Sequence, residues 1–163
     1  MNKKINAALN AQLNREYYAS YLYFAMAAFF EEEGYSGFAK WMETQSKEEH
    51  DHMMRIYRYI LDRSGTVDLQ DIKAPKFKGK NTIEVIHEAL KHEKKVSGFI
   101  NDIVELSFQE KDYATHNFLQ WFVSEQVEEE ALFSQVEKKL ELIGDNKAGL
   151  YMIDREIGDL REV

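Results

Sequence analysis

Four long stretches of this sequence repeat apolar residues at steps of three and four, and carboxylates interrupt each repeat. Such steps place residues on one face of an α-helix, so the sequence predicts four helices whose buried faces turn acidic near the middle. Burying an unpaired carboxylate is costly, and these faces contain no Lys or Arg that would neutralise it. A bound multivalent cation is therefore the simplest stabilising partner. The four faces are Ile5, Leu9, Leu13, Glu16, Ser20, Tyr23, Ala27 and Phe30; Phe38, Met42, Gln45, Glu49, His52, Ile56 and Tyr59; Ile83, Ile86, Leu90, Glu93, Ser97, Ile100 and Val104; and Phe118, Phe122, Glu125, Glu129, Leu132, Val136 and Leu140.

The composition excludes several other classes of protein. The 163 residues are expected to form a single domain, residues 1–163, with a hydrophobic core of its own. The net charge of −8 argues against a nucleic-acid partner, and the absence of cysteine excludes disulfides and thiolate metal ligands. The N-terminus lacks the features of a signal peptide, and no stretch has the length of a membrane span. We therefore expect a soluble, cytoplasmic protein without a membrane partner.

Glycines and the single proline divide the chain into helical segments. The expected helices cover residues 3–33, 36–64, 82–111 and 113–143, and a short fifth helix covers residues 147–161. Asn81 is a plausible N-cap for the third of these helices. Residues 65–81 contain Pro75 and Gly79, show no helical period, and are expected to form a loop.

The connections between these helices predict the topology. The first two helices are joined by almost nothing, as are the third and fourth, so each pair should be antiparallel. The loop of roughly 17 residues can reach about 56 Å when extended, whereas each long helix measures about 42 Å. We therefore expect an all-α fold, a four-helix bundle with one long crossover between helices two and three, and with helices one and three parallel. The apolar face of the fifth helix also needs a surface to cover it, and another subunit is one candidate. That face consists of Leu150, Ile153, Ile157 and Leu160.

The acidic positions should meet at one level of this bundle, because each lies near the middle of its helix. Glu49 and His52 form a Glu-x-x-His pair whose side chains converge on one helix face. Carboxylates with one imidazole and no sulfur favour iron or manganese over structural zinc, and calcium usually binds in loops. Glu49 is the natural bridge between two ions. Oxygen ligands favour Fe(III), so such a site would make Fe(II) easy to oxidise by dioxygen or peroxide. The whole cluster comprises Glu16, Glu49, His52, Glu93, Glu125, Gln126 and Glu129, with Glu48 and Glu128 beside it.

Several side chains near this cluster have two interpretations. Tyr23 either donates a hydrogen bond to a buried carboxylate, which we favour, or donates an electron during oxidation. Glu48 and Glu128 are as consistent with solvated surface charges as with metal ligands. Trp121, one turn before Glu125, is expected to pack in the core. No role is assigned to the remaining histidines, which are His50, His87, His92 and His116.

These motifs, in this order, resemble those of the non-haem, prokaryotic-type ferritins over essentially the whole chain. The matching motifs are Asn14-Arg15-Glu16-Tyr17-Tyr18, Glu48-Glu49-His50-Asp51-His52-Met53, Lys91-His92-Glu93 and the run from Asn117 to Glu130. A lone Glu-x-x-His would be weak support, whereas this ordered set is specific. The resemblance implies a hollow shell of twenty-four identical subunits that oxidises Fe(II) and stores it as a ferric oxy-hydroxide mineral. In that family the fifth helix packs near the fourfold axis.

The resemblance also implies a role for individual residues, distributed over three iron sites. The first site matches Glu16, Glu49 and His52. The second matches Glu49, Glu93 and Glu129, with Glu49 bridging and Gln126 nearby. The third matches Glu48, Glu125, Glu128 and Glu129. Tyr23 matches the tyrosine beside this ferroxidase centre.

Differences between this sequence and the related bacterioferritins specify which kind of ferritin it resembles. Bacterioferritins carry a second Glu-x-x-His on helix four, where this chain has Gln126 to Glu129 without a histidine. His50 stands where bacterioferritins have the methionine that ligates haem, so no haem is expected. A metal-buffering helical bundle without turnover remains the alternative to an iron-storing ferroxidase, and oxygen consumption on addition of Fe(II) distinguishes the two.

Overall fold

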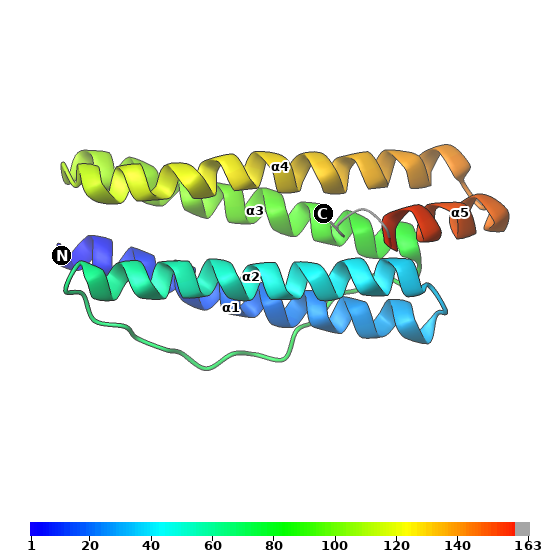
Figure 1. Ribbon diagram of the computed structural model, residues 1–163, viewed down its shortest axis with the longest axis horizontal. Helices are drawn as coiled ribbons and strands as arrows, with labels where there is room; N and C mark the ends of the chain where they lie inside the picture. Colours follow the sequence, from blue (N-terminus) through cyan, green and yellow to red (C-terminus); the bar gives the residue numbers. More distant parts are fainter. Residues whose placement is uncertain (159–163) are drawn as a thin grey trace.

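The computed structural model describes residues 1–158, which fold into helices joined by turns and one long loop (Figure 1). The helices are α1 (Lys3–Glu32), α2 (Ser36–Asp62), α3 (Thr82–Gln109), α4 (Tyr113–Ile143) and α5 (Lys147–Gly158). The predicted all-α bundle with a long crossover and a short fifth helix is confirmed. The predicted ends of the first four helices agree within two residues. The expected end of the fifth helix at residue 161, and Leu160 with it, lie outside the described residues.

Polar side chains define where three of the helices begin. Asn2 accepts a hydrogen bond from the backbone N–H of Lys4 at 2.8 Å at the start of α1. Asn81 accepts one from Glu84 at 3.0 Å, as its predicted N-cap role requires. Asp112 caps α4 in the same way. These caps satisfy backbone donors that a helix leaves unpaired in its first turn.

Three helices end in the same backbone motif. Gly34, Ser64 and Lys111 adopt left-handed conformations with φ of 81°, 52° and 54°. The N–H of the residue after each one bonds back into the last helical turn, as Tyr35 does to the carbonyl of Phe30 at 2.9 Å. Only Gly34 is a glycine, so two of these ends carry a side chain in a conformation that usually favours glycine.

The direction of α3 differs from the prediction. Lys4 at the start of α1 pairs with Glu110 at the end of α3 with an N–O distance of 2.6 Å. Phe29, near the end of α1, packs against Phe77, just before α3 begins, with ring centroids 5.8 Å apart. α3 is therefore antiparallel to α1 and parallel to α2 (Figure 1), and the expectation of parallel helices one and three is wrong. A connection that runs the full length of a bundle returns the chain to the level where α2 began, so the next helix repeats the direction of α2.

A ladder of asparagines on α1 holds the first part of the crossover loop. Asn6, Asn10 and Asn14 recur every four residues and lie along one side of the helix. The amide of Asn10 donates to the carbonyl of residue 66 at 2.8 Å and accepts from the N–H of residue 68 at 2.6 Å. Asn6 and Asn14 make equivalent paired bonds to residues 66, 68 and 70. The side chains of α1 thus pair with the loop backbone in the way an adjacent β-strand would.

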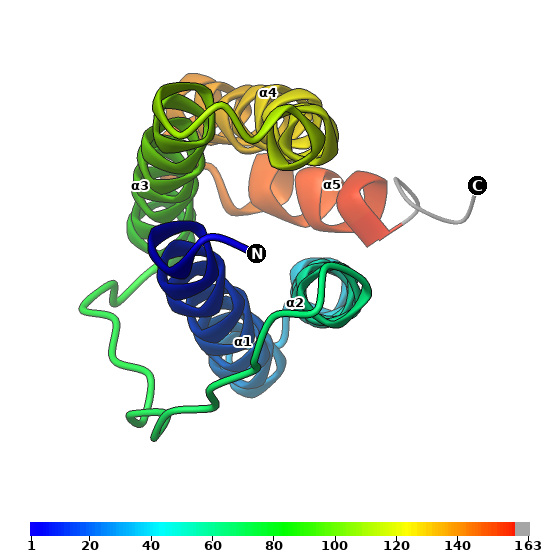
Figure 2. The same cartoon turned by 90° about the vertical axis from the view of Figure 1, so that its left-hand side faces the viewer.

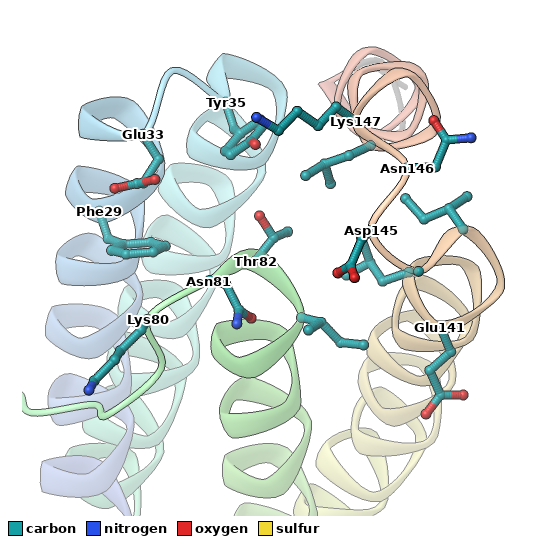
Figure 3. Close-up of a pocket in the computed structure, with 15 residues that line it drawn as sticks. Phe29, Glu33, Tyr35, Lys80, Asn81, Thr82, Glu141, Asp145, Asn146 and Lys147 are labelled. Atoms are coloured by element: carbon teal, nitrogen blue, oxygen red, sulfur yellow. The ribbon is translucent and has the colours of Figure 1, made fainter.

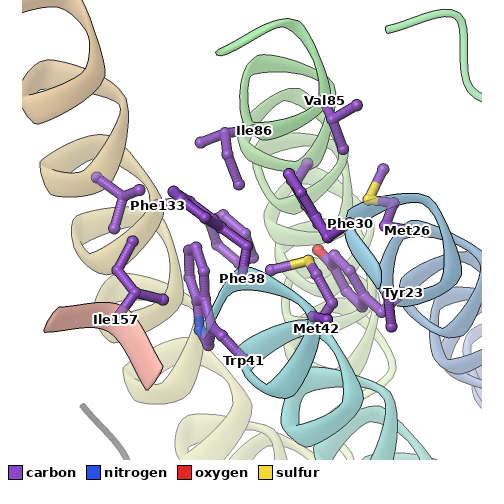
Figure 4. Close-up of a cluster of buried hydrophobic side chains, with 14 of the residues drawn as sticks. Tyr23, Met26, Phe30, Phe38, Trp41, Met42, Val85, Ile86, Phe133 and Ile157 are labelled. Carbon is purple, nitrogen blue, oxygen red and sulfur yellow. The ribbon is translucent and has the colours of Figure 1, made fainter. Parts of the chain in front are cut away.

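α5 packs on its own chain. Ile153 and Ile157 are buried in a cluster with Trp41 of α2 and Phe133 of α4 (Figure 4). The carboxylate of Asp154 accepts a hydrogen bond from the backbone N–H of Phe38 at 2.9 Å, in the first turn of α2. A second subunit is therefore not needed to cover the described part of this face, contrary to the interpretation offered from sequence. Seen down the bundle, α5 lies between α2 and α4 (Figure 2).

The approach of α5 to α2 depends on Gly37. A Cβ atom at that position would lie 1.7 Å from the backbone oxygen of Asp154, which is far inside contact distance. Glycine therefore allows the two backbones to meet at the start of α2.

Two hydrophobic clusters fill the two halves of the bundle. One cluster includes Phe30, Phe38 and Phe133, and the other includes Leu9, Ile56 and Phe122. The polar layer that contains the predicted acidic cluster lies between them along the helices. Among the described residues, no helix is both long and apolar enough to span a membrane.

The buried face of α4 is rotated slightly from the predicted one. Gln126 and Phe133 are buried, whereas Glu125 and Leu132 are only partly buried. The predicted positions Phe122, Glu129, Val136 and Leu140 are buried as expected. Because steps of three and four are both compatible with one face, adjacent residues such as Glu125 and Gln126 cannot be ranked by spacing alone.

Candidate metal centre

Three of the predicted ligands meet inside the bundle. Glu16 of α1 and Glu49 and His52 of α2 each offer one ligand atom, and these atoms lie within 4.8 Å of one another. The three residues are 1%, 2% and 5% exposed. Nδ1 of His52 lies 3.1 Å from Oε2 of Glu49, so the two side chains of this pair are within hydrogen-bond distance of each other. Among the described residues, this is the only group of three His, Asp or Glu residues with such spacing.

Glu93 and Glu129 supply a second pair of buried carboxylates, from α3 and α4. Glu93 accepts hydrogen bonds on both oxygens, from the hydroxyl of Tyr23 and from the amide of Gln126 at 3.0 Å. Oε2 of Glu129 accepts a bond from the amide of Gln45 at 2.9 Å. The hydrogen-bonding interpretation of Tyr23 matches this contact, which joins α1 to α3 at the level of the centre.

The carboxylates interact strongly because burial removes water between them. Burial, followed by the charge of Glu93, raises the pKa of Glu49 well above its ordinary value. Burial and then the charge of Glu49 do the same to the pKa of Glu16. Burial and the charge of Glu93 raise the pKa of Glu129 to about 8. The centre therefore holds protons without a metal, and a cation that displaces them would relieve the repulsion.

The residues of the predicted third site lie beside this centre, nearer the surface. Glu48 and Glu125 are partly buried and Glu128 is exposed. The charges of Glu125 and Glu128 both contribute to the raised pKa of Glu129, after burial and Glu93. They add negative potential on one side of the buried pair, and their assignment as ligands stays a prediction.

The protein environment of the centre includes residues that the sequence interpretation left out or set aside. The ring of His52 lies edge-on to Trp121 of α4, with centroids 5.3 Å apart, and Arg55 lies 4.1 Å above the Trp121 ring. His92, which was given no role, lies edge-on to Tyr23 at 6.0 Å. Burial lowers the pKa of His92 to about 4, so its ring is neutral near pH 7.

Gln12 is the clearest omission among the residues around the centre. Its side chain is completely buried, and its amide nitrogen donates to Oε1 of Glu16 at 2.8 Å. The signal was present in the sequence, since Gln12 precedes Glu16 by four residues and residues so spaced are neighbours on a helix. Gln45 had a place on the predicted buried face of α2, but its bond to Glu129 was not foreseen.

One pocket lies away from this centre, at one end of the bundle. It has a volume of about 560 Å³ and is lined by residues such as Phe29, Tyr35, Lys80, Thr82 and Lys147 (Figure 3). None of the predicted site residues lines it. The candidate metal centre is a layer of buried polar side chains within the helices.

Comparison with known proteins decides the family. A family model for the ferritin-like domain matches residues 6–143, from early in α1 to the end of α4. The chain belongs to the ferritin family. It is 40% identical over 158 residues to the bacterial non-heme ferritin of Staphylococcus aureus, covering 97% of this chain and 95% of that protein. It is 38% identical over 160 residues to a probable bacterial non-heme ferritin-like protein of Haemophilus influenzae, covering 98% and 97% of the two chains.

Solved ferritin structures agree with this family at the level of the whole chain. The open-pore ferritin of the hyperthermophilic archaeon Archaeoglobus fulgidus superposes with a TM-score of 0.97 at 40% identity, covering 99% of each chain. A humanized archaeal ferritin superposes equally well at 42% identity. The helical arrangement, including the crossover and α5, is therefore that of a ferritin subunit.

Proposed function

We propose that this protein is an iron-storage ferritin that oxidises Fe(II) at the buried centre of its bundle. One observation carries the proposal: Glu16, Glu49 and His52 bring ligand atoms within 4.8 Å of one another in the interior. No Lys or Arg is buried among the described residues, so a cation is the available counter-charge. Iron accords with this donor set, because carboxylates with one imidazole suit hard to borderline metals.

The chemistry follows from how the centre holds charge. Binding of Fe(II) displaces the protons that Glu16 and Glu49 retain in the metal-free protein, and these protons leave to solvent. Two Fe(II) ions then give up one electron each, and dioxygen takes both electrons with two protons to become hydrogen peroxide. With peroxide as the oxidant, two electrons and two protons produce two waters. Anionic oxygen ligands favour this oxidation because they stabilise Fe(III) more than Fe(II).

The remaining residues have distinct proposed roles. Glu93 and Glu129 would hold the second iron with Glu49 as the bridge, and Gln126 would support Glu93. Glu48, Glu125 and Glu128 would form a third site with Glu129, toward the surface. Tyr23 would orient Glu93 through its hydroxyl. The oxidised iron would be stored as a ferric oxy-hydroxide mineral inside a shell of twenty-four copies of this chain, and the cytoplasm is the proposed compartment.

Substitution at the centre tests the proposal. His52→Ala and Glu49→Ala remove direct ligands, so Fe(II) oxidation should slow by more than about 100-fold, beyond the loss expected when only a supporting partner is removed. Oxygen uptake and absorbance after anaerobic Fe(II) loading measure the rate, with gel filtration confirming the size of the assembly. His87→Ala is the matched control, because His87 is exposed and bonds to Glu137.

Two results would contradict the proposal. Oxidation at the wild-type rate in His52→Ala would remove the centre from the reaction. Binding of Fe(II) without oxygen uptake in the wild-type protein would favour the metal-buffering alternative.

A further inference from the structure

The two oxygens of Glu16 have different surroundings. Oε1 accepts the hydrogen bond from the Gln12 amide at 2.8 Å, whereas Oε2 is buried and receives no bond from an amide, hydroxyl or backbone donor. The carboxyl groups of Glu16 and Glu49 also interact with each other. A buried carboxylate oxygen with no donor is costly to maintain. Because Glu16 belongs to the group with metal-ligand spacing, Oε2 is the oxygen that remains available for a cation.

The orientation of the Gln12 amide is also determined by its neighbours. Nη1 of Arg15 donates to Oε1 of Gln12 at 3.3 Å. A guanidinium has only donors, so the carbonyl end of the amide faces Arg15 and the NH₂ end faces Glu16. If the amide were flipped, it would place a donor against a donor and an acceptor against a carboxylate.

Arg15 is in turn held by the neighbouring helix. Its guanidinium carbon lies 3.7 Å from the centroid of the Phe99 ring on α3, a cation–π contact. The charges of Glu16 and of Asp102, which is also on α3, both act on the guanidinium. The contacts between α1 and α3 therefore influence Glu16 through the side chains of Arg15 and Gln12.

We propose that Gln12, kept in one orientation by Arg15, is a positioning residue that reserves Oε2 of Glu16 for the first metal ion. The inference rests on the proposed function, since it concerns the same centre. Each of three carboxylates in the centre then accepts a hydrogen bond from one glutamine amide, since Gln45 donates to Glu129 and Gln126 donates to Glu93. Gln12 differs from these two in having its orientation fixed by a cation.

The expected effect is a loss of metal affinity that a loss of stability alone does not produce. Partners that orient metal ligands typically change affinity by about 10–100-fold when removed. Gln12→Met keeps the length and most of the volume of the side chain but offers no donor, so Oε1 of Glu16 is released. The variant also leaves Oε1 of Glu16 buried without a donor, which lowers stability, so its metal affinity has to be compared with that of a control variant that is also destabilised.

Anaerobic Co(II) titration of the assembled protein tests the proposal without any oxidation step. The visible absorption of bound Co(II) reports coordination, and the component that is missing in His52→Ala identifies the first site. Gln12→Met should weaken Co(II) binding at that site about tenfold or more and change its absorption. Arg15→Met should act in the same direction, and its effect should be smaller when Gln12 is already replaced, because part of that effect acts through Gln12.

Asn10→Ala is the matched control on the same helix. Asn10 is buried and bonds to the loop, so this variant lowers stability without contacting Glu16. Its first-site affinity for Co(II) should equal that of the wild-type protein. Equal affinity and an equal spectrum in Gln12→Met and the wild type would overturn the positioning role while leaving the proposed function intact. Failure of the wild-type protein to bind Co(II) at all would instead count against the metal centre itself.

Discussion

The metal-free protein should become less stable as the pH rises, because it buries carboxylates that retain protons. The pKa of Glu129 is raised from 4.5 to about 8 by burial and by the charge of Glu93. The folded state therefore binds a proton that the unfolded chain has released throughout this interval. Stability from this group is fully present below pH 4.5 and is lost as the pH rises through about 8. Glu16, Glu49 and Glu93 have pKa values shifted in the same direction.

The size of the effect follows from the two pKa values of Glu129. Each pH unit between them corresponds to about 1.4 kcal/mol, so the whole interval corresponds to about 5 kcal/mol. Between about pH 6.5 and about pH 8 the loss from Glu129 alone is about 2 kcal/mol. A change of that size lowers the melting temperature of a domain this long by about 4–8 °C.

His92 has the opposite sign but acts at lower pH. Burial lowers its pKa from 6.5 to about 4, so its contribution to stability is present above pH 6.5 and is lost as the pH falls through about 4. Above about pH 6.5, the change of stability with pH therefore comes from the carboxylates and not from His92.

Calorimetry of the chelator-treated assembly at the two ends of that interval measures the prediction. Glu129→Gln keeps the shape of the side chain and cannot ionise, so its melting temperature should fall less over the same interval. Saturating Zn(II) should abolish most of the pH dependence in the wild-type protein, because the metal binds the ionised carboxylates. A wild-type melting temperature that is constant or rises with pH, or an identical slope in Glu129→Gln, would refute the reasoning.

Two further predictions concern the fold around the centre. Gly37→Ala places a Cβ 1.7 Å from the backbone oxygen of Asp154, so α5 should be displaced and stability should fall by about 1–3 kcal/mol or more. Limited proteolysis at the α4–α5 turn should accelerate, and unchanged cleavage and stability would contradict this contact. Asn10→Ala leaves two loop backbone groups without their side-chain partner and should cost about 1–3 kcal/mol in chemical denaturation. The amide hydrogen of Asp68 should then exchange faster, whereas Fe(II) oxidation should keep its wild-type rate.

Periodicity predicted the helices and the acidic layer because burial imposes a regular pattern on each helix. Glu16, Glu49, His52, Glu93 and Glu129 are all among the most buried polar residues of the described chain. Spacing could not decide between Glu125 and Gln126, since the two are adjacent and either completes a step of three or four. That choice is made by the rotation of α4, which packing of the whole bundle determines.

Other features depend on contacts that a pattern within one helix does not contain. The direction of α3 follows from the crossover and not from the pattern within the helix, because a loop that runs the length of the bundle starts α3 at the end where α2 began. The packing of α5 on α2 requires the two backbones to approach closely at Gly37. A glycine in the sequence does not reveal which segment approaches it. Gln12 was overlooked because it is polar and adjacent to the apolar stripe. Its role depends on Arg15 and Phe99, and Phe99 belongs to another helix.

The asparagine ladder restricts the choice of residues in one of the two segments that it joins more than in the other. Within the loop, Asn6, Asn10 and Asn14 bond to backbone atoms and not to side chains, and residues 66, 68 and 70 are exposed. These hydrogen bonds do not depend on which side chains the loop carries. The one exception is proline, which has no N–H to donate. The side chains at positions 66, 68 and 70 can thus change and give the surface new chemistry, while the path of this part of the crossover is encoded in the helix beside it.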